Sequence, residues 1–201
     1  MPLHARDSAP QLLLIVQERL KPGGAEAYGE LESHIARLCV RLKCPHPYLA
    51  LESLETPKEV WWLNMFGSEA EKESVEREYA RNEPLMTELG PLSLRKQALT
   101  DPPTTLLTRH RPELSTGAAF RITGARFFVS ATSDERSKAE GAVFESSSGQ
   151  YFVFASAANR ADADRIAARA GDGSAIFAVQ PLWSFPADSW LAADPDFWGL
   201  T

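Results

Sequence analysis

One polar residue interrupts the most apolar segment of this sequence, and it is the first candidate for chemistry. Asn64 lies in the run 60–66, where alternation along a strand places Trp62 and Phe66 on the same side. A buried amide needs hydrogen-bond partners, and beside aromatic rings it can orient an aromatic substrate or hold an oxygenated intermediate. The alternative is structural, with Asn64 satisfying backbone groups at a strand end. We take Asn64 as a candidate catalytic residue and Trp62 and Phe66 as candidate substrate-binding residues.

Two further side chains could move protons or donate hydrogen bonds near such an amide. His34 lies at the edge of the apolar stripe of a predicted helix, about 60° from Leu31, so its imidazole could be a general base in a pocket between helix and sheet. Tyr79 could donate a hydrogen bond from a second predicted helix. Each has a plainer role, His34 as a partly buried structural residue and Tyr79 as a packing residue.

Two carboxylates occupy matching positions in the two halves of the chain. Glu52 precedes Ser53 and Glu145 precedes Ser146, each pair at the end of a strand-like segment. A strand carboxylate that faces a cavity would have a raised pKa and could take a substrate proton. Solvation at a strand end is the plainer interpretation. Glu52 is retained as a candidate substrate-binding residue.

The two cysteines, Cys39 and Cys44, lie five residues apart on a predicted helix. At about 100° per residue they would point about 140° away from each other, which argues against an internal disulfide. A zinc site needs four converging ligands, and the sequence has no CxxC pair, so no metal site is predicted. We therefore expect two reduced thiols, as is usual in cytosolic proteins.

Several motifs with well-defined chemistry are absent from the sequence. It contains no GxGxxG, GxxxxGK[ST], GxSxG or HExxH pattern, and no carboxylate–histidine cluster has metal-ligand spacing. Nucleotide hydrolysis, triad hydrolysis and metalloprotease chemistry are therefore not expected.

The amino-acid composition limits which binding partners and which cellular compartment are expected for this protein. The 201 residues are 44% hydrophobic and 24% charged, which is ordinary for a globular protein. A formal net charge of -6 without clustered Lys and Arg argues against a nucleic-acid partner. The apolar run at 12–16 is too short to span a membrane, and no signal peptide is evident. We expect a cytoplasmic protein that binds a small-molecule ligand, with no nucleic acid and no membrane as partner.

The elements that must position these residues follow the ferredoxin-like order β-α-β-β-α-β in the first half, residues 11–110. A continuous apolar run at 11–17 predicts a strand, and apolar residues at steps of three and four predict a helix at 25–43. The remaining predicted elements are strands at 48–54, 59–66 and 104–110 and a helix at 68–82, with another turn or two at 85–89.

The second half, residues 120–182, repeats this order with a truncated first helix. The strand–turn–strand–helix pattern occurs in both halves, with a Glu-Ser pair ending the first strand, which indicates duplication. The predicted elements are strands at 120–131, 142–147, 150–157 and 174–180, a helical stub within 133–141 and a helix at 160–170. Residues 111–119 are the predicted linker, and the aromatic-rich tail at 183–201 is expected to pack on the core.

The strand at 60–66 is apolar on both of its faces, although helices can cover only one face of a sheet. A second sheet, from the other half or from another chain, would cover the other face. The predicted fold class is α+β: two tandem ferredoxin-like units whose antiparallel sheets pack as an α+β barrel. The chain is then either a monomeric pseudo-dimer or a subunit of a homodimer.

These patterns resemble the dimeric α+β barrel superfamily, in particular proteins similar to the antibiotic biosynthesis monooxygenases. The resemblance rests on element order, the apolar run 12–16, the entry to the second strand at 44–48, and residues 61–66 followed by Ser68-Glu69-Ala70. It covers 11–110 well and 120–180 more loosely. The family implies a small, often aromatic, ligand bound between sheet and helices.

The resemblance implies an enzyme similar to the cofactor-independent monooxygenases, acting on an aromatic or quinol-like metabolite. Such chemistry needs little beyond an apolar pocket and one or two polar groups, because an electron-rich phenol or quinol can react with dioxygen itself, and no cofactor is expected. The alternative is a non-catalytic ligand-binding or oligomeric assembly protein. Haem degradation is a third, weaker hypothesis, because Glu73 and Ser74 stand where the family often places a histidine.

Overall fold

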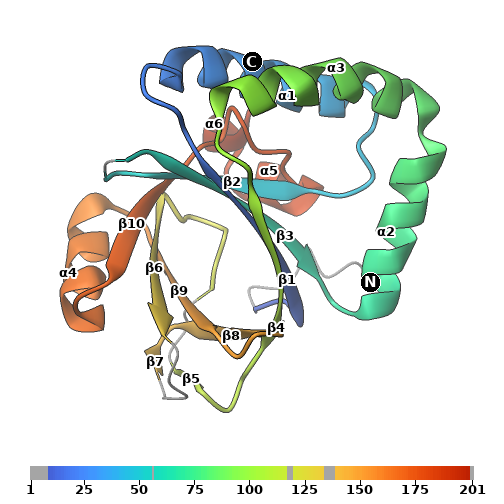
Figure 1. Ribbon diagram of the computed structural model, residues 1–201. Helices are drawn as coiled ribbons and strands as arrows, with labels where there is room; N and C mark the ends of the chain where they lie inside the picture. The colour runs from blue at the N-terminus through green and yellow to red at the C-terminus, as the bar shows by residue number, and fades with distance from the viewer. Residues whose placement is uncertain (1–8, 56, 117–119, 134–138, 200–201) are drawn as a thin grey trace.

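The computed structural model describes residues 9–55, 57–116, 120–133 and 139–199 (Figure 1). Its main strands are β1 (Leu12–Arg19), β2 (Tyr48–Ser53), β3 (Glu59–Phe66), β4 (Thr104–His110), β6 (Phe127–Ser133), β8 (Ala142–Ser146), β9 (Tyr151–Ala157) and β10 (Ser174–Val179). They form one closed barrel in the order β1-β3-β2-β10-β6-β9-β8-β4, with every neighbouring pair antiparallel.

Helices lie outside the barrel and near one of its ends (Figure 1). They are α1 (Ala25–Arg41), α2 (Glu69–Arg81), α3 (Glu83–Leu99), α4 (Arg160–Ala170), α5 (Asp188–Ala193) and α6 (Pro195–Trp198). Two short strands, β5 (Ser115–Thr116) and β7 (Ala139–Glu140), pair in parallel beside the barrel. No helix in the described part of the chain is long and apolar enough to cross a membrane.

The two halves of the chain have the same strand order. In the first half it is β4-β1-β3-β2, and in the second it is β10-β6-β9-β8, so each half runs fourth, first, third, second. The halves join where β2 pairs with β10 and where β4 pairs with β8. The predicted fold class, two ferredoxin-like units packed as an α+β barrel, is confirmed, and a single chain closes the barrel.

The barrel interior is a packed aromatic core. Trp61 projects inward from β3, and its ring lies 6.3 Å from Phe152, 6.1 Å from Phe154 and 4.7 Å from Phe177. Trp190 of α5 and Trp198 of α6 are buried in the same cluster. Side chains fill a small barrel of this kind, so its middle is a packed core.

The outer face of the first half supports a second core. Alternation along β3 turns Val60 and Trp62 outward, away from Trp61. Buried leucines of α1 and α3, among them Leu31 and Leu92, pack over this face. Strands β1, β2 and β3 of the first sheet are therefore covered by helices on the outside and by the second sheet on the inside.

Helix α3 is much longer than the sequence indicates. One or two turns at 85–89 are predicted, but the helix continues through Pro91 to Leu99. The Asn82 side chain caps its start by accepting a hydrogen bond from the Leu85 amide. Burial of Leu85 and Leu92 holds the helix together, although proline removes one backbone hydrogen bond.

The entry to the second half also differs from the prediction. The strand predicted at 120–131 begins only at Phe127, because a turn with Gly124 at φ +76° precedes it. Of the helical stub predicted within 133–141, residues 134–138 lie outside the described residues, and 139–140 are strand β7. In the predicted linker, β5 occupies 115–116, and 117–119 lie outside the described residues.

Candidate functional site

A cavity of about 220 Å³ lies between the outer face of β1, β2 and β3 and the helices α1, α2 and α3. It is lined by Val16, Glu18, Glu32, Ile35, Cys39, Cys44, Tyr48, Trp62, Asn64, Tyr79, Leu89 and Lys96. An apolar cavity of about 150 Å³ can hold benzene, so this volume suits a ligand with one ring. A mostly apolar lining with a few polar groups is typical of small-molecule sites.

Acidic and basic side chains meet at one end of the cavity. The Glu18 carboxylate accepts hydrogen bonds from the Tyr28 hydroxyl at 2.5 Å and from Trp62 Nε1 at 3.0 Å. Lys96 Nζ lies 2.9 Å from Glu18 Oε1 and 3.1 Å from Glu32 Oε1. The ammonium group also lies 4.8 Å from the centre of the Trp62 ring. One cation from α3 is therefore shared by two carboxyl groups and an aromatic face.

The Glu32 carboxyl is the chemically unusual member of this group. Its side chain is buried on α1, with 1% of the residue exposed. Burial raises its pKa to about 7, and the nearby Glu18 carboxylate adds to the rise, while the Lys96 ammonium opposes it. Its Oε1 accepts no hydrogen bond from the described residues, although Lys96 is close. This carboxyl therefore exchanges its proton near neutral pH.

The Lys96 ammonium remains charged in this environment. Burial alone would lower its pKa, but the attraction of Glu32 and Glu18 outweighs burial, and the pKa is raised. A single ammonium cannot neutralise two carboxylates, which is why one of the pair holds a proton readily.

Thiol and phenol groups gather at the other end of the cavity. Cys44 Sγ lies 2.8 Å from the Tyr79 hydroxyl, and the Tyr48 hydroxyl donates to Cys39 Sγ at 3.6 Å. Glu32 and Cys39 both face the cavity from α1, and seven residues of helix separate the two ends by about 10 Å.

Three of the predicted site residues lie in this cavity. Trp62 and Asn64 project from the outer face of β3, and Tyr79 reaches in from α2. The sheet register places Trp62 opposite Val16 of β1 and Asn64 opposite Tyr48 of β2.

The other three predicted site residues lie outside the cavity. His34 is exposed on α1, because the buried stripe of that helix centres on Tyr28, Glu32 and Cys39, and His34 is on the opposite flank. Glu52 lies at the end of β2, where it accepts a hydrogen bond from Gln180 at 2.5 Å.

Phe66 shares the outer face of β3 with Asn64 but lies beyond the cavity. It is buried and stacks on the ring of His46, with centroids 4.5 Å apart. The role of this side chain in the structure is packing.

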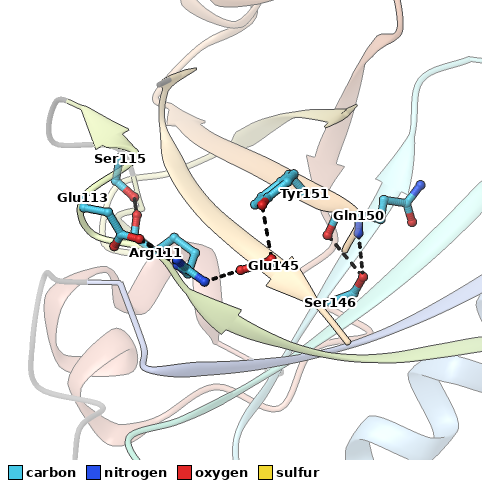
Figure 2. A network of polar contacts seen from close by, with 7 residues as sticks. All are labelled: Arg111, Glu113, Ser115, Glu145, Ser146, Gln150 and Tyr151. Carbon is cyan, nitrogen blue, oxygen red and sulfur yellow. Dashed lines mark hydrogen bonds and ion pairs between the residues drawn. The ribbon is translucent and has the colours of Figure 1, made fainter. Parts of the chain in front are cut away.

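Glu145, the counterpart of Glu52, also sits in a network at a strand end (Figure 2). It pairs with Arg111 and accepts a hydrogen bond from the Tyr151 hydroxyl at 3.1 Å. Arg111 also pairs with Glu113 at 2.8 Å, and both its partners are partly exposed. Because each glutamate is paired at the rim of the sheet, the matching positions of Glu52 and Glu145 reflect strand pairing.

Sequence reasoning missed the polar end of the cavity. Glu18 lies on an apolar strand, and Glu32 lies four residues after Tyr28 within the apolar stripe of α1, so both interrupt an apolar face. A charged residue on a buried face is a usable signal. Lys96 carries no comparable signal, because α3 itself was not predicted as far as residue 96.

The two thiols lie closer together than the sequence predicts. The predicted separation of about 140° assumes a helix that continues to Cys44. Helix α1 ends at Arg41, and Lys43 adopts φ +53°, so the chain reverses and brings Cys44 back to Cys39. Both thiols line the same cavity.

No group of three or more His, Cys, Asp or Glu side chains suited to a metal ion occurs among the described residues. The polar chemistry of the cavity consists of the carboxyl–ammonium end, the thiol–phenol end and the Asn64 amide.

Comparison with known proteins supports the fold. No protein-family model and no curated protein matches this chain. A solved structure from Fusobacterium nucleatum subsp. nucleatum, described as a "putative monooxygenase", superposes with a TM-score of 0.55 at 6% identity over 85% of this chain and 93% of that one. A "putative chlorite dismutase" gives a TM-score of 0.43 at 12% identity over 92% of this chain and 98% of that one. The first likeness, with the strand order, establishes the dimeric α+β barrel fold.

Proposed function

We propose that this protein binds a single-ring phenol or quinol in the cavity between sheet and helices and oxidises it with dioxygen, as a cofactor-independent monooxygenase. The observation that carries the proposal is the buried Glu32 carboxyl, with its pKa near 7, beside the Lys96 ammonium in an aromatic-lined cavity. The description of the similar F. nucleatum structure as a monooxygenase agrees with this class of reaction.

The first step is proton transfer. The ionised Glu32 carboxylate, which lines the cavity, takes the proton of the bound hydroxyl. The Lys96 ammonium, 3.1 Å from that carboxyl, holds the phenolate oxygen by charge. Trp62 lies beside the ammonium group and supplies an aromatic face for the ring.

The phenolate then reacts with dioxygen directly. One oxygen atom enters the ring and the other leaves as water, and the substrate supplies all four electrons, so a phenol becomes a quinone. At the other end of the cavity the Asn64 amide can donate a hydrogen bond to the oxygen added to the ring, and the Tyr79 hydroxyl lies beside Cys44 there. Burial raises the pKa of Tyr79, so this hydroxyl acts as a donor and not as a base.

The proposal is tested by dioxygen consumption with a panel of single-ring phenols and quinols, measured beside quinone formation. The wild type should consume one dioxygen per quinone formed. Glu32→Gln should lower the rate by about a hundredfold or more, because general-base catalysis contributes on this order. Glu88→Gln is the matched control, since Glu88 is exposed on α3 and pairs with Arg41. Equal rates in the wild type and Glu32→Gln would exclude Glu32 as the base.

A non-catalytic ligand-binding protein is the second candidate, and one observation favours it. Both Glu18 oxygens are already engaged, by Tyr28 and Trp62 on one side and by Lys96 on the other. Such a satisfied network is typical of a structural role. Saturable phenol binding without dioxygen consumption in any member of the panel would decide for this candidate.

A further inference from the structure

The thiol pair in the cavity wall has no part in the proposed oxidation. Cys39 and Cys44 are both free and buried, with 2% and 8% of each residue exposed. Both line the cavity, so a small molecule that enters it reaches both sulfur atoms.

A defined helix ending brings the two thiols together. The Cys44 amide donates to the Cys39 carbonyl at 2.8 Å, and the Lys43 amide donates to the Val40 carbonyl at 3.4 Å. With Lys43 in the left-handed region at φ +53°, this is the Schellman ending of a helix, in which the residues at the two ends of the longer bond contact each other. The backbone therefore holds Cys39 and Cys44 side by side, as an intramolecular disulfide requires.

The environment makes the two thiols chemically different. The neighbouring Cys39 thiol and the hydrogen bond from Tyr79 lower the pKa of Cys44, although burial opposes them. The neighbouring Cys44 thiol, and then burial, raise the pKa of Cys39. A thiolate is the nucleophile in thiol oxidation, so Cys44 attacks first and Cys39 second.

We propose that Cys39 and Cys44 form a redox-active pair, which a small peroxide entering the cavity converts into an intramolecular disulfide. The Cys44 thiolate attacks one peroxide oxygen, giving a sulfenic acid and, with hydrogen peroxide, one water. The Cys39 sulfur then attacks the Cys44 sulfur, the S–S bond forms, and the sulfenic oxygen leaves as a second water. The two thiols lose two electrons and two protons, and the peroxide gains both.

The test is a titration of the dilute wild-type protein with hydrogen peroxide, followed by intact mass and by non-reducing tryptic mapping. We expect the chain to lose two hydrogens, and dithiothreitol to restore them. Trypsin cleaves at Arg41 and Lys43, between the cysteines, so the bridge appears as a cross-linked pair of peptides. Cys39→Ser should stop at a sulfenic acid that dimedone traps, and Tyr79→Phe should slow the reaction severalfold.

Two results would overturn the proposal. One is oxidation of the wild type to sulfinic acids without a cross-linked peptide pair. The other is bridging only between chains, seen as a dimer on a non-reducing gel. Glu32→Gln should still form the bridge, because that carboxyl lies at the opposite end of the cavity from the two thiols. Loss of phenol oxidation in that variant with intact bridging separates this inference from the proposed function.

Discussion

At the scale of single residues, the unusual feature is a carboxyl group that titrates near neutral pH inside a folded protein. Glu32 is buried on a helix face that is otherwise apolar and shares one lysine with Glu18. Leaving a carboxylate in such a place is costly unless its charge is compensated. A residue that costs stability while facing a cavity is a strong candidate for function.

The raised pKa of Glu32 predicts how the unfolding free energy of the protein depends on pH. The pKa of Glu32 rises from 4.5 to about 7 on folding, so between these values the folded state binds more protons than the unfolded state. The unfolding free energy should therefore fall as the pH rises through this range, by on the order of 1 to 3 kcal/mol from this residue.

Urea unfolding at about pH 5 and about pH 8 measures the effect. Glu32→Gln cannot titrate, so it should gain stability relative to the wild type as the pH rises. If the difference between the two proteins is the same at both pH values, Glu32 does not have a raised pKa.

At the scale of elements, the cavity depends on how helices begin and end. The Schellman ending at Lys43 sets the thiol pair, and the continuation of α3 through Pro91 delivers Lys96. Alternation in the sequence groups Trp62 and Asn64 on one face of β3, and periodicity predicts the helix that carries Tyr79. The register of α3 depends on tertiary packing of Leu85 and Leu92, which no local pattern reveals.

The position of His34 also depends on tertiary packing that no local pattern reveals. An angle of about 60° from Leu31 predicts that His34 lies at the edge of the apolar stripe, whereas the position of the whole stripe against the sheet decides which flank is buried. Glu32 interrupts that stripe and was the better candidate on the same helix.

The left-handed ending of α1 at Lys43 predicts how a glycine at this position changes stability. Lys43 adopts φ +53°, where a side chain costs about 1 kcal/mol and glycine has no such cost. Lys43→Gly should therefore raise the unfolding free energy by about 0.5 to 1 kcal/mol in urea titrations. Arg77→Gly, at an exposed position within α2, is the control and should lower it by about 1 kcal/mol. A loss of stability in Lys43→Gly would show that the left-handed ending is wrong.

At the scale of the whole molecule, two similar sheets close one barrel and share one core. The β2–β10 and β4–β8 pairings join the halves, and Trp61 of the first half packs on rings of the second. The helices that cover the two sheets pack differently, however. Ala163 and its neighbours on α4 pack closely on the second sheet, whereas α1 and α3 leave the described cavity over the first.

The shared core predicts that the halves unfold together. Trp61→Ala should lower the unfolding free energy by about 3 to 5 kcal/mol, because it empties the centre of the core. Near- and far-ultraviolet circular dichroism should follow one coincident transition in both the variant and the wild type. A second transition left at the wild-type midpoint would mean that the second half holds its fold without the first.

The central claim is that the cavity binds a phenol and takes its proton, and a spectral titration tests it most directly. The ligand is 4-cyanophenol at neutral pH, a single-ring phenol that is mainly un-ionised in free solution and absorbs at longer wavelength when ionised. We predict saturable binding at one site per chain with the phenolate spectrum, retained in Glu88→Gln and lost in Lys96→Met and Glu32→Gln. A bound spectrum of the neutral phenol, or no saturable binding, would contradict the account.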